Sequence, residues 1–262
     1  MTFITLTTDF STRDGNVGVM KGVIWRIAPE AKIADISHDI NPQDIRQAAF
    51  ILNRQVCYFP ENTVHIVVVD PGVGTERRPI AAQIGPQRFV GPDNGVFTPM
   101  YLRAEKEEWP IHIVHTDNQE FWGEKISDIF HGRDIFSPVG AHFASGVSLE
   151  KLGKSIDDHV RIHLPFPKRT ENGVIGEVSH IDHFGNIASN IHRDEIADLG
   201  EVDVTLRGVT IHGLVRTFGE REPGELIALY SSTDYLIVSE VNGSAGKRIK
   251  PEVGDVIKVV AK

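Results

Sequence analysis

The chain has 262 residues, with 36 acidic and 27 basic side chains and a formal net charge of -9. This length and a hydrophobic content of 40% suffice for one large or two modest globular domains, and they exclude disordered, collagen-like and coiled-coil classes. The acidic balance lacks the basic footprint that nucleic-acid binding needs, and the lone Cys57 cannot form an intrachain disulfide.

The first residues, MTFITLTTDF, carry no positive charge ahead of their apolar side chains and reach Asp9 at once, which is not the pattern of a signal peptide. No apolar run approaches the ~18 residues that a membrane span requires. We therefore expect a soluble, cytoplasmic protein that acts on a small molecule, with neither a membrane nor a nucleic acid as partner.

Over residues 1–164, short apolar runs alternate with stretches of helical periodicity. The predicted strands are 3–6, 32–36, 64–69, 79–84 and 111–114. The third of them is apolar without interruption from residue 66 onward, as in a strand covered on both faces. Residues 45–56 show helical spacing, with Asn41 as the predicted N-cap and Pro42 in the first turn. This alternation predicts an α/β domain with a mostly parallel sheet and helices on both faces.

The pattern changes after Pro165 and Pro167, and residues 165–172 are predicted to form a linker. Short β-rich runs separated by turn residues follow it, at 173–180, 202–206, 209–214, 226–229, 235–238 and 256–260. They predict a smaller all-β, barrel-like domain over residues 173–262.

Polar segments follow several predicted strands, and the carboxyl ends of parallel strands bring such loops together. Asp9 follows the first strand, where a carboxylate can accept hydrogen bonds from both hydroxyls of a ribose. Asp70 opens a glycine-rich loop that lacks the Gly-Lys-Ser/Thr of a P-loop. The other segments are 91–95 and 130–134, the second of which contains His131. Each has a structural alternative as a turn, an ion pair or a satisfied histidine.

Two histidine pairs have the spacing of metal ligands, namely His112 with His115 and His180 with His183. Both pairs lie in predicted strands, where a separation of three residues places the side chains on opposite faces. The zinc motif H-E-x-x-H and the serine-nucleophile motif Gly-x-Ser-x-Gly are absent, and one cysteine excludes thiolate zinc and iron–sulfur sites. No metal site is predicted.

Six segments, in chain order, resemble the S-adenosyl-L-methionine (SAM) hydroxide adenosyltransferases, the SAM hydrolases related to the fluorinase and chlorinase enzymes. They are TTDFSTRDGNVGVMKG, VVDPGVGTERR, GPDNG, FHGRDIF, IDHFGN and SEVNGSA, which together span nearly the full chain. The resemblance implies hydrolysis of SAM to adenosine and L-methionine by attack of activated water at ribose C5′, with no cofactor. It also implies an α/β N-terminal and a β-barrel-like C-terminal domain, and a homotrimer with each active site between the N-terminal domain of one subunit and the C-terminal domain of the next.

The resemblance further implies a role for individual residues. Asp70, Arg77 and His131 match the triad assigned to water activation. Asp9 matches the aspartate that holds both ribose hydroxyls, and Asp182 the aspartate that meets the methionine ammonium group. The other implied substrate-binding residues are Asp14 and Asn16 near the methionine, Phe184 and Asn186 on the adenine side, and Ser232, Glu240, Val241 and Asn242.

Departures from the halogenating relatives favour hydrolysis. Those relatives carry an aromatic residue in place of Asp70 and a tyrosine in place of His131, and a carboxylate repels a halide. Thr233 stands in place of a fluorinase arginine and Asn16 in place of a serine, so the contacts at the methionine end differ. The alternatives are a chlorinase-like halogenase, a non-catalytic SAM-binding protein and a metal-dependent phosphoesterase that uses the strand-end Asp and His groups.

Overall fold

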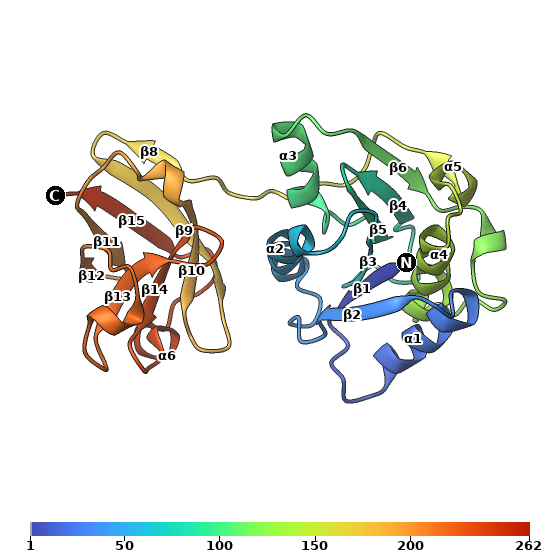
Figure 1. The fold of residues 1–262 in the computed structure, drawn as a ribbon, viewed down its shortest axis with the longest axis horizontal. Coiled ribbons are helices and arrows are strands. Elements are labelled where there is room, and N and C mark those ends of the chain that lie inside the picture. The colour runs from blue at the N-terminus through green and yellow to red at the C-terminus, as the bar shows by residue number, and fades with distance from the viewer. Residues whose placement is uncertain (1) are drawn as a thin grey trace. The chain divides into compact units, whose positions relative to one another are not determined.

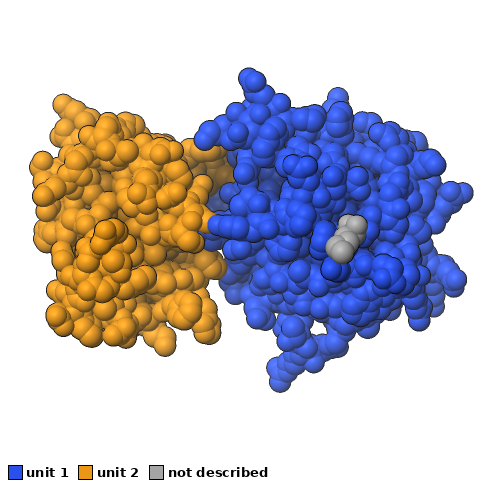
Figure 2. Space-filling model, viewed as in Figure 1, with its two compact units in different colours: residues 1–162 blue, residues 163–262 orange. Residues whose placement is uncertain are grey.

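A computed structural model describes residues 2–262 of the chain. The chain divides into two compact units, one ending at Ile162 and the other beginning at His163 (Figure 2). The first unit contains two hydrophobic cores and the second contains one. Each unit is therefore described by itself.

The first unit is a seven-stranded sheet with helices on both faces (Figure 1). Its strands are β1 (Phe3–Thr8), β2 (Lys32–Ser37), β3 (Val64–Val68), β4 (Pro79–Ile84), β5 (Gln87–Pro92), β6 (Ile111–His115) and β7 (Lys154–Ser155). Its helices are α1 (Asn16–Ile27), α2 (Ile45–Gln55), α3 (Thr98–Lys106), α4 (Ser137–Ala144) and α5 (Leu149–Leu152). The strand order is β2-β1-β3-β5-β4-β6-β7.

Strand β3 shows why the chain is apolar without interruption from Ile66 to Val69. Val64 and Ile66 belong to the core that includes buried side chains of α1 and α4. Val67 and the residue that follows the strand, Val69, belong to the core that includes buried side chains of α2 and α3. Because successive side chains of a strand point to opposite faces, a strand covered by helices on both sides buries every side chain, and apolar residues suit such positions best. The one polar residue of β3, His65, is also buried, and its Nδ1 lies 2.7 Å from Thr5 Oγ1.

The prediction of an α/β domain with helices on both faces is confirmed, but the sheet is mixed. Strands β2, β1, β3 and β5 are parallel, whereas β4, β6 and β7 pair antiparallel to their neighbours. The reason is a tight hairpin that joins β4 to β5 through Gly85 and Pro86, with Gly85 at φ +51°. The predicted strands omit β5 because its last residues, Gly91 and Pro92, are typical of a turn.

Helix α2 begins later than predicted. Its N-cap is Asp44, whose side chain accepts a hydrogen bond from Gln47 N at 2.9 Å, so Asn41 and Pro42 lie outside the helix. Gln43 has a left-handed φ of +67°, which prevents a helix from starting before it.

The second unit is an antiparallel, barrel-like sheet, as predicted. Its elements are β8 (Lys168–Thr170), β9 (Gly173–Ile181), β10 (Ile187–His192), β11 (Val202–Leu206), β12 (Val209–His212), β13 (Leu226–Tyr230), β14 (Tyr235–Glu240), α6 (Ala245–Ile249) and β15 (Val256–Ala261). The order is β12-β11-β15-β9-β10-β14-β13, and a bond from Val215 N to Ala228 O at 3.0 Å joins the two ends of this order.

Two strands of the second unit differ from the sequence prediction. Strand β8 pairs with β9 and lies within residues 165–172, which were expected to form only a linker. Strand β10 is absent from the predicted strands because the polar residues Ser189 and Asn190 interrupt its apolar pattern. Both polar side chains are satisfied internally, Ser189 by Leu236 O and Asn190 by Glu177 N and Pro165 O.

Candidate active site

The candidate residues of the first unit come from three loops: one that follows β1, one that follows β3, and one that precedes α4. Asp9 follows β1 directly, and Asp70 comes two residues after β3. His131 immediately precedes a π-helical segment, Gly132–Phe136, which continues into α4. Such π-helical turns are rare and occur frequently at functional sites.

Close packing brings the three loops together. A Cβ at Gly74 would collide with the carbonyl oxygen of Asp128, and Gly74 also has a φ of +74°, so the Asp70 loop approaches the His131 loop through a glycine. Phe10, next to Asp9, makes an edge-to-face contact with Phe130 at a centroid distance of 5.8 Å. The loops that carry Asp9, Asp70 and His131 therefore form one packed edge of the sheet.

Asp70, Arg77 and His131 form a continuous hydrogen-bonded chain. Arg77 Nε donates to Asp70 Oδ1 at 3.1 Å, and Arg77 Nη2 donates to Asp70 Oδ2 at 2.5 Å. The same Nη2 lies 2.9 Å from His131 Nδ1. The side chains of Asp70 and Arg77 are only 4% and 6% exposed, so this bidentate ion pair is largely removed from water.

The protonation state of this chain follows from its geometry. A guanidinium group has no acceptor, so His131 Nδ1 accepts the hydrogen bond from Arg77 and a neutral ring carries its hydrogen on Nε2. Burial lowers the pKa of His131, and the positive charge of Arg77 lowers it further, which favours the neutral ring. Arg77 Nη1 is buried and has no hydrogen-bond partner among residues 2–262. The group thus combines a carboxylate acceptor with two kinds of N–H donor, which can hold and orient a water molecule.

Asp9 is half-buried, and its Oδ2 accepts a hydrogen bond from Gln43 N at 2.8 Å. Asp14 is exposed, and Asn16 is half-buried at the first position of α1, after the N-cap Gly15 at φ +77°. The contact with Gln43 was not anticipated from the sequence. It uses a main-chain N–H, so no side-chain type signals it.

The segment 91–95 has a structural role in the first unit. Asp93 is buried, forms an ion pair with Arg78 at 2.6 Å and accepts a hydrogen bond from Val160 N at 2.8 Å. Asn94 Nδ2 donates to Val69 O at 2.9 Å, directly before Asp70 in the chain. This motif therefore holds the end of β3 in place.

In the second unit, Asp182 holds Asn186 across a tight turn between β9 and β10. Its two oxygens accept hydrogen bonds from Asn186 N at 2.8 Å and from Asn186 Nδ2 at 2.7 Å. Gly185, at φ +88°, packs against Ser244, where any Cβ would collide with the hydroxyl, and Gly185 O accepts from Gly246 N. Phe184 projects from this turn and is 75% exposed.

The remaining candidates of the second unit lie at the two ends of β14. Glu240 is its last residue, and Val241 and Asn242 follow it toward α6, with Asn242 at φ +53°. Ser232 lies in the turn between β13 and β14, at the opposite end of the strand. Within this unit the structure therefore groups Asp182, Asn186 and the 240–242 segment, and separates Ser232 from them.

Among residues 2–262, no three His, Cys, Asp or Glu side chains are arranged to hold a metal ion. No described helix is both long enough and apolar enough to cross a membrane.

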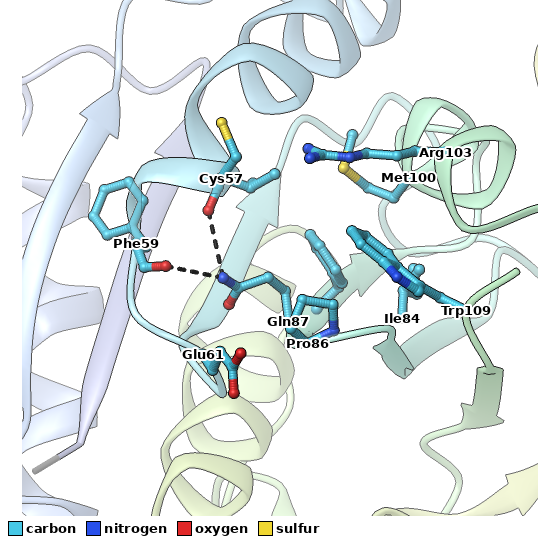
Figure 3. A pocket seen from close by; sticks show the side chains of 11 residues that line it. Cys57, Phe59, Glu61, Ile84, Pro86, Gln87, Met100, Arg103 and Trp109 are labelled. Atoms are coloured by element: carbon cyan, nitrogen blue, oxygen red, sulfur yellow. Dashed lines mark hydrogen bonds between the residues drawn. The ribbon is translucent and has the colours of Figure 1, made fainter. Parts of the chain in front are cut away.

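A separate pocket of about 220 Å³ lies at the opposite edge of the first unit's sheet, where β4 ends and β5 begins (Figure 3). Its walls are mostly apolar and aromatic, with Gln87, Arg103, Glu61 and Cys57 as the polar members. Gln87 Nε2 donates to Phe59 O at 3.1 Å. None of the candidate site residues lines this pocket.

Comparison with known proteins gives one consistent result. The profile of the SAM hydroxide adenosyltransferase N-terminal domain matches residues 4–153, and that of the C-terminal domain of the same family matches residues 176–258. A solved structure from Thermotoga maritima, described as an uncharacterized conserved protein, superposes with a TM-score of 0.91 at 35% identity and covers 98% of this chain and 99% of its own.

The curated relatives include hydrolases and fluorinases. A protein of Salinispora tropica named (R)-S-adenosyl-L-methionine hydrolase is 35% identical over 99% of this chain and 98% of its own. A protein of Thermus thermophilus with the same name is 36% identical over 96% of this chain and 97% of its own. A fluorinase of Nocardia brasiliensis is 27% identical over 96% and 97%.

Proposed function

The chain belongs to the SAM hydroxide adenosyltransferase family, and on that basis we propose that it hydrolyses S-adenosyl-L-methionine to adenosine and L-methionine. The observation that carries the proposal is the hydrogen-bonded chain of Asp70, Arg77 and His131. It provides a buried acceptor and oriented donors for a water molecule, which is the reactant that is hardest to activate in this reaction.

In the proposed reaction, the oxygen of water attacks ribose C5′ in line with the C5′–sulfur bond. That bond breaks with its electron pair remaining on sulfur, so methionine departs as a neutral thioether and needs no general acid. The water loses one proton. Because His131 Nδ1 is engaged by Arg77 and Nε2 carries hydrogen, Asp70 is the proton acceptor that the geometry favours, while His131 and Arg77 orient the attacking oxygen. General-base assistance contributes about 10²–10⁴-fold, and alignment of the reactants contributes more.

Substrate contacts follow the same family correspondence. Asp9 accepts hydrogen bonds from the two ribose hydroxyls, and Asp14, Asn16 and Asp182 face the methionine. The adenine is held by Phe184, Asn186 and the segment from Glu240 to Asn242. The remaining proposed substrate contact, Ser232, lies at the far end of β14. The net charge of -9 suits a substrate that is cationic at sulfur and at its ammonium group.

The proposed assembly is a cytoplasmic homotrimer in which the first unit of one subunit and the second unit of the next form each site. The proposal includes no cofactor and neither nucleic acid nor membrane as partner. Mixing tests the arrangement: Asp70→Asn and Asp182→Ala proteins, each inactive alone, should regain activity after co-refolding, because some sites then combine two unaltered units. Equal inactivity before and after mixing would contradict shared sites.

The reaction is tested by incubating the protein with SAM in chloride-free buffer and separating the products by liquid chromatography. Because the hydrolase relatives are named for the (R) form of the substrate, both sulfonium epimers are assayed. We expect adenosine and methionine in equal amounts, with loss of turnover in Asp70→Asn. Binding without turnover would indicate a SAM-binding protein. Chloride-dependent formation of 5′-chloro-5′-deoxyadenosine would indicate a halogenase, which the negative charge of Asp70 disfavours.

A further inference from the structure

The loop that carries Asp9 is held by the segment that follows β2. Gln43 N donates to the Asp9 carboxylate at 2.8 Å, and Ser11 N donates to His38 O at 2.8 Å. The His38 side chain makes the third link, because its Nδ1 lies 2.8 Å from Thr8 Oγ1. These three contacts fall on residues 8, 9 and 11, so they bracket the proposed ribose-binding carboxylate from both sides.

His38 is itself held by a chain of polar contacts. Its Nε2 lies 3.1 Å from Asp35 Oδ1, although its N–H is not aimed squarely at that oxygen, and Asp35 forms an ion pair with Lys21 of α1 at 2.6 Å. With a hydrogen on Nε2, His38 Nδ1 accepts from the Thr8 hydroxyl. The lone pairs of that hydroxyl then accept from Phe10 N at 3.2 Å.

This directed chain runs from α1 to the backbone on either side of Asp9. His38 is only 5% exposed and Thr8 is fully buried, so water does not readily replace a lost link. Ser11 adopts a left-handed φ of +50°, a conformation that a non-glycine residue keeps only when its surroundings fix it. The bond from Ser11 N to His38 O is one of the contacts that fix it.

We infer that His38 is a positioning residue which, through Thr8 and Ser11, holds the Asp9 carboxylate in the orientation that accepts the 2′- and 3′-hydroxyls of the substrate ribose. The inference rests on the proposed function, because it takes Asp9 as the ribose-binding group. It assigns His38 no contact with substrate. Its effect is specific to ligands that carry the two hydroxyls.

The same strand offers a matched control. Thr5 Oγ1 lies 2.7 Å from His65 Nδ1, which is a second buried Thr–His pair of nearly identical geometry. Thr5 precedes Asp9 by four residues, and His65 belongs to β3, away from the loop that binds Asp9. Removing either threonine hydroxyl therefore leaves a buried imidazole nitrogen without its partner, but only one removal loosens the Asp9 loop.

The experiment measures the dissociation constants of adenosine and of 2′,3′-dideoxyadenosine by calorimetry for the full-length protein and its variants. The dissociation constant of 2′,3′-dideoxyadenosine divided by that of adenosine reports the contribution of the two hydroxyls to binding. We expect Thr8→Val and His38→Ala to reduce this ratio about 5- to 20-fold, and Asp9→Ala to bring it close to 1. Thr8→Ser keeps the hydroxyl and should therefore retain most of the ratio of the unaltered protein. Thr5→Val should leave the ratio within 2-fold of the unaltered protein while lowering the melting temperature about as much as Thr8→Val.

A ratio in Thr8→Val that matches the unaltered protein would overturn the positioning role, as would an equal loss of the ratio in Thr5→Val. A ratio near 1 in the unaltered protein would overturn it as well, by removing the ribose assignment of Asp9. SAM turnover is measured on the same preparations. If the unaltered protein hydrolyses SAM but shows no preference for the two hydroxyls, this inference fails while the proposed reaction stands; if it does not hydrolyse SAM, the proposed reaction fails. If His38→Ala does not fold, Thr8→Val and Thr8→Ser decide the question.

Discussion

The two units present their candidate residues in opposite ways. In the first unit, Asp70 and Arg77 are almost fully buried and bonded to each other and to His131. In the second unit, Phe184 stands 75% exposed on a turn that Asp182 and Asn186 tie internally. The difference separates two tasks. Groups that activate a nucleophile must be held in place before the reaction. A ring that stacks on a ligand needs only a fixed backbone turn to carry it and one exposed face.

The largest expected effect comes from breaking the buried ion pair of the first unit. Arg77→Met leaves the Asp70 carboxylate buried without its cation, which costs about 3–5 kcal/mol of unfolding free energy. It also removes two hydrogen bonds that orient Asp70, so SAM turnover should fall at least about 10²-fold. Urea unfolding and product chromatography measure the two losses. Arg77→Lys keeps the positive charge but cannot form the two parallel hydrogen bonds to Asp70. If this variant were as active as the unaltered protein, the bidentate geometry would have no role in the reaction.

Acid should destabilise the first unit. Burial lowers the pKa of four of its histidines, most strongly that of His65, which falls from 6.5 to about 4; the others are His131, His142 and His159. The folded unit therefore favours the neutral rings. The stability linked to His65 is fully present above pH 6.5 and is lost as the pH falls through 6.5 toward 4, by about 3 kcal/mol.

Tryptophan fluorescence measures this loss in the first unit alone, because Trp25, Trp109 and Trp122 all belong to it. Circular dichroism follows both units. We expect the fluorescence midpoint in urea to fall between pH 7 and pH 4.5, and His65→Asn to flatten that dependence. A pH-independent fluorescence midpoint would show that His65 titrates normally.

A smaller effect is expected from the exposed aromatic ring of the second unit. Phe184→Ala should change the unfolding free energy by less than about 0.5 kcal/mol, because the side chain is already exposed. Loss of stacking on adenine should weaken SAM binding by about 1–3 kcal/mol, which is roughly 5- to 150-fold in KM. Phe184→Tyr keeps the ring and serves as the control. An unchanged KM in Phe184→Ala would place adenine elsewhere.

The smallest expected effect is that of replacing Ser232, and it tests whether only one end of β14 lies near the bound adenosine. Ser232 lies at the opposite end of this strand from Asn242, so Ser232→Ala should change the dissociation constant of adenosine less than about 2-fold. Asn186→Ala, at the other end, should raise it about 10-fold, because it removes a proposed hydrogen bond to the base and the partner of Asp182. Calorimetry with adenosine compares the two. Equal effects of the two substitutions would contradict the placement of adenosine at the Asn242 end of β14.

The sequence predicts the architecture well because its signals are local. The apolar run from Ile66 to Val69 predicts β3, and short β-rich runs separated by turn residues predict the barrel-like unit. The mixed direction of the sheet was not predictable from such runs, because it depends on the hairpin at Gly85 and Pro86. Strand β10 also stays hidden, since Ser189 and Asn190 are polar and find their partners only in the folded chain. In the site, side-chain types point to Asp70 and His131, but no residue type reveals that the main chain of Gln43 holds Asp9.

The π-helical turn at Gly132–Phe136 has a consequence for how this protein can change. Ser137 N bonds to Gly132 O, so the turn holds one residue more than an α-helical turn would. Deleting one residue there would restore α-helical spacing and rotate the preceding chain by about 100° around the helix axis. His131 would then turn away from Arg77 even though every functional side chain remained present. Insertions and deletions in this short stretch should therefore be far less tolerated than substitutions of its outward-facing residues.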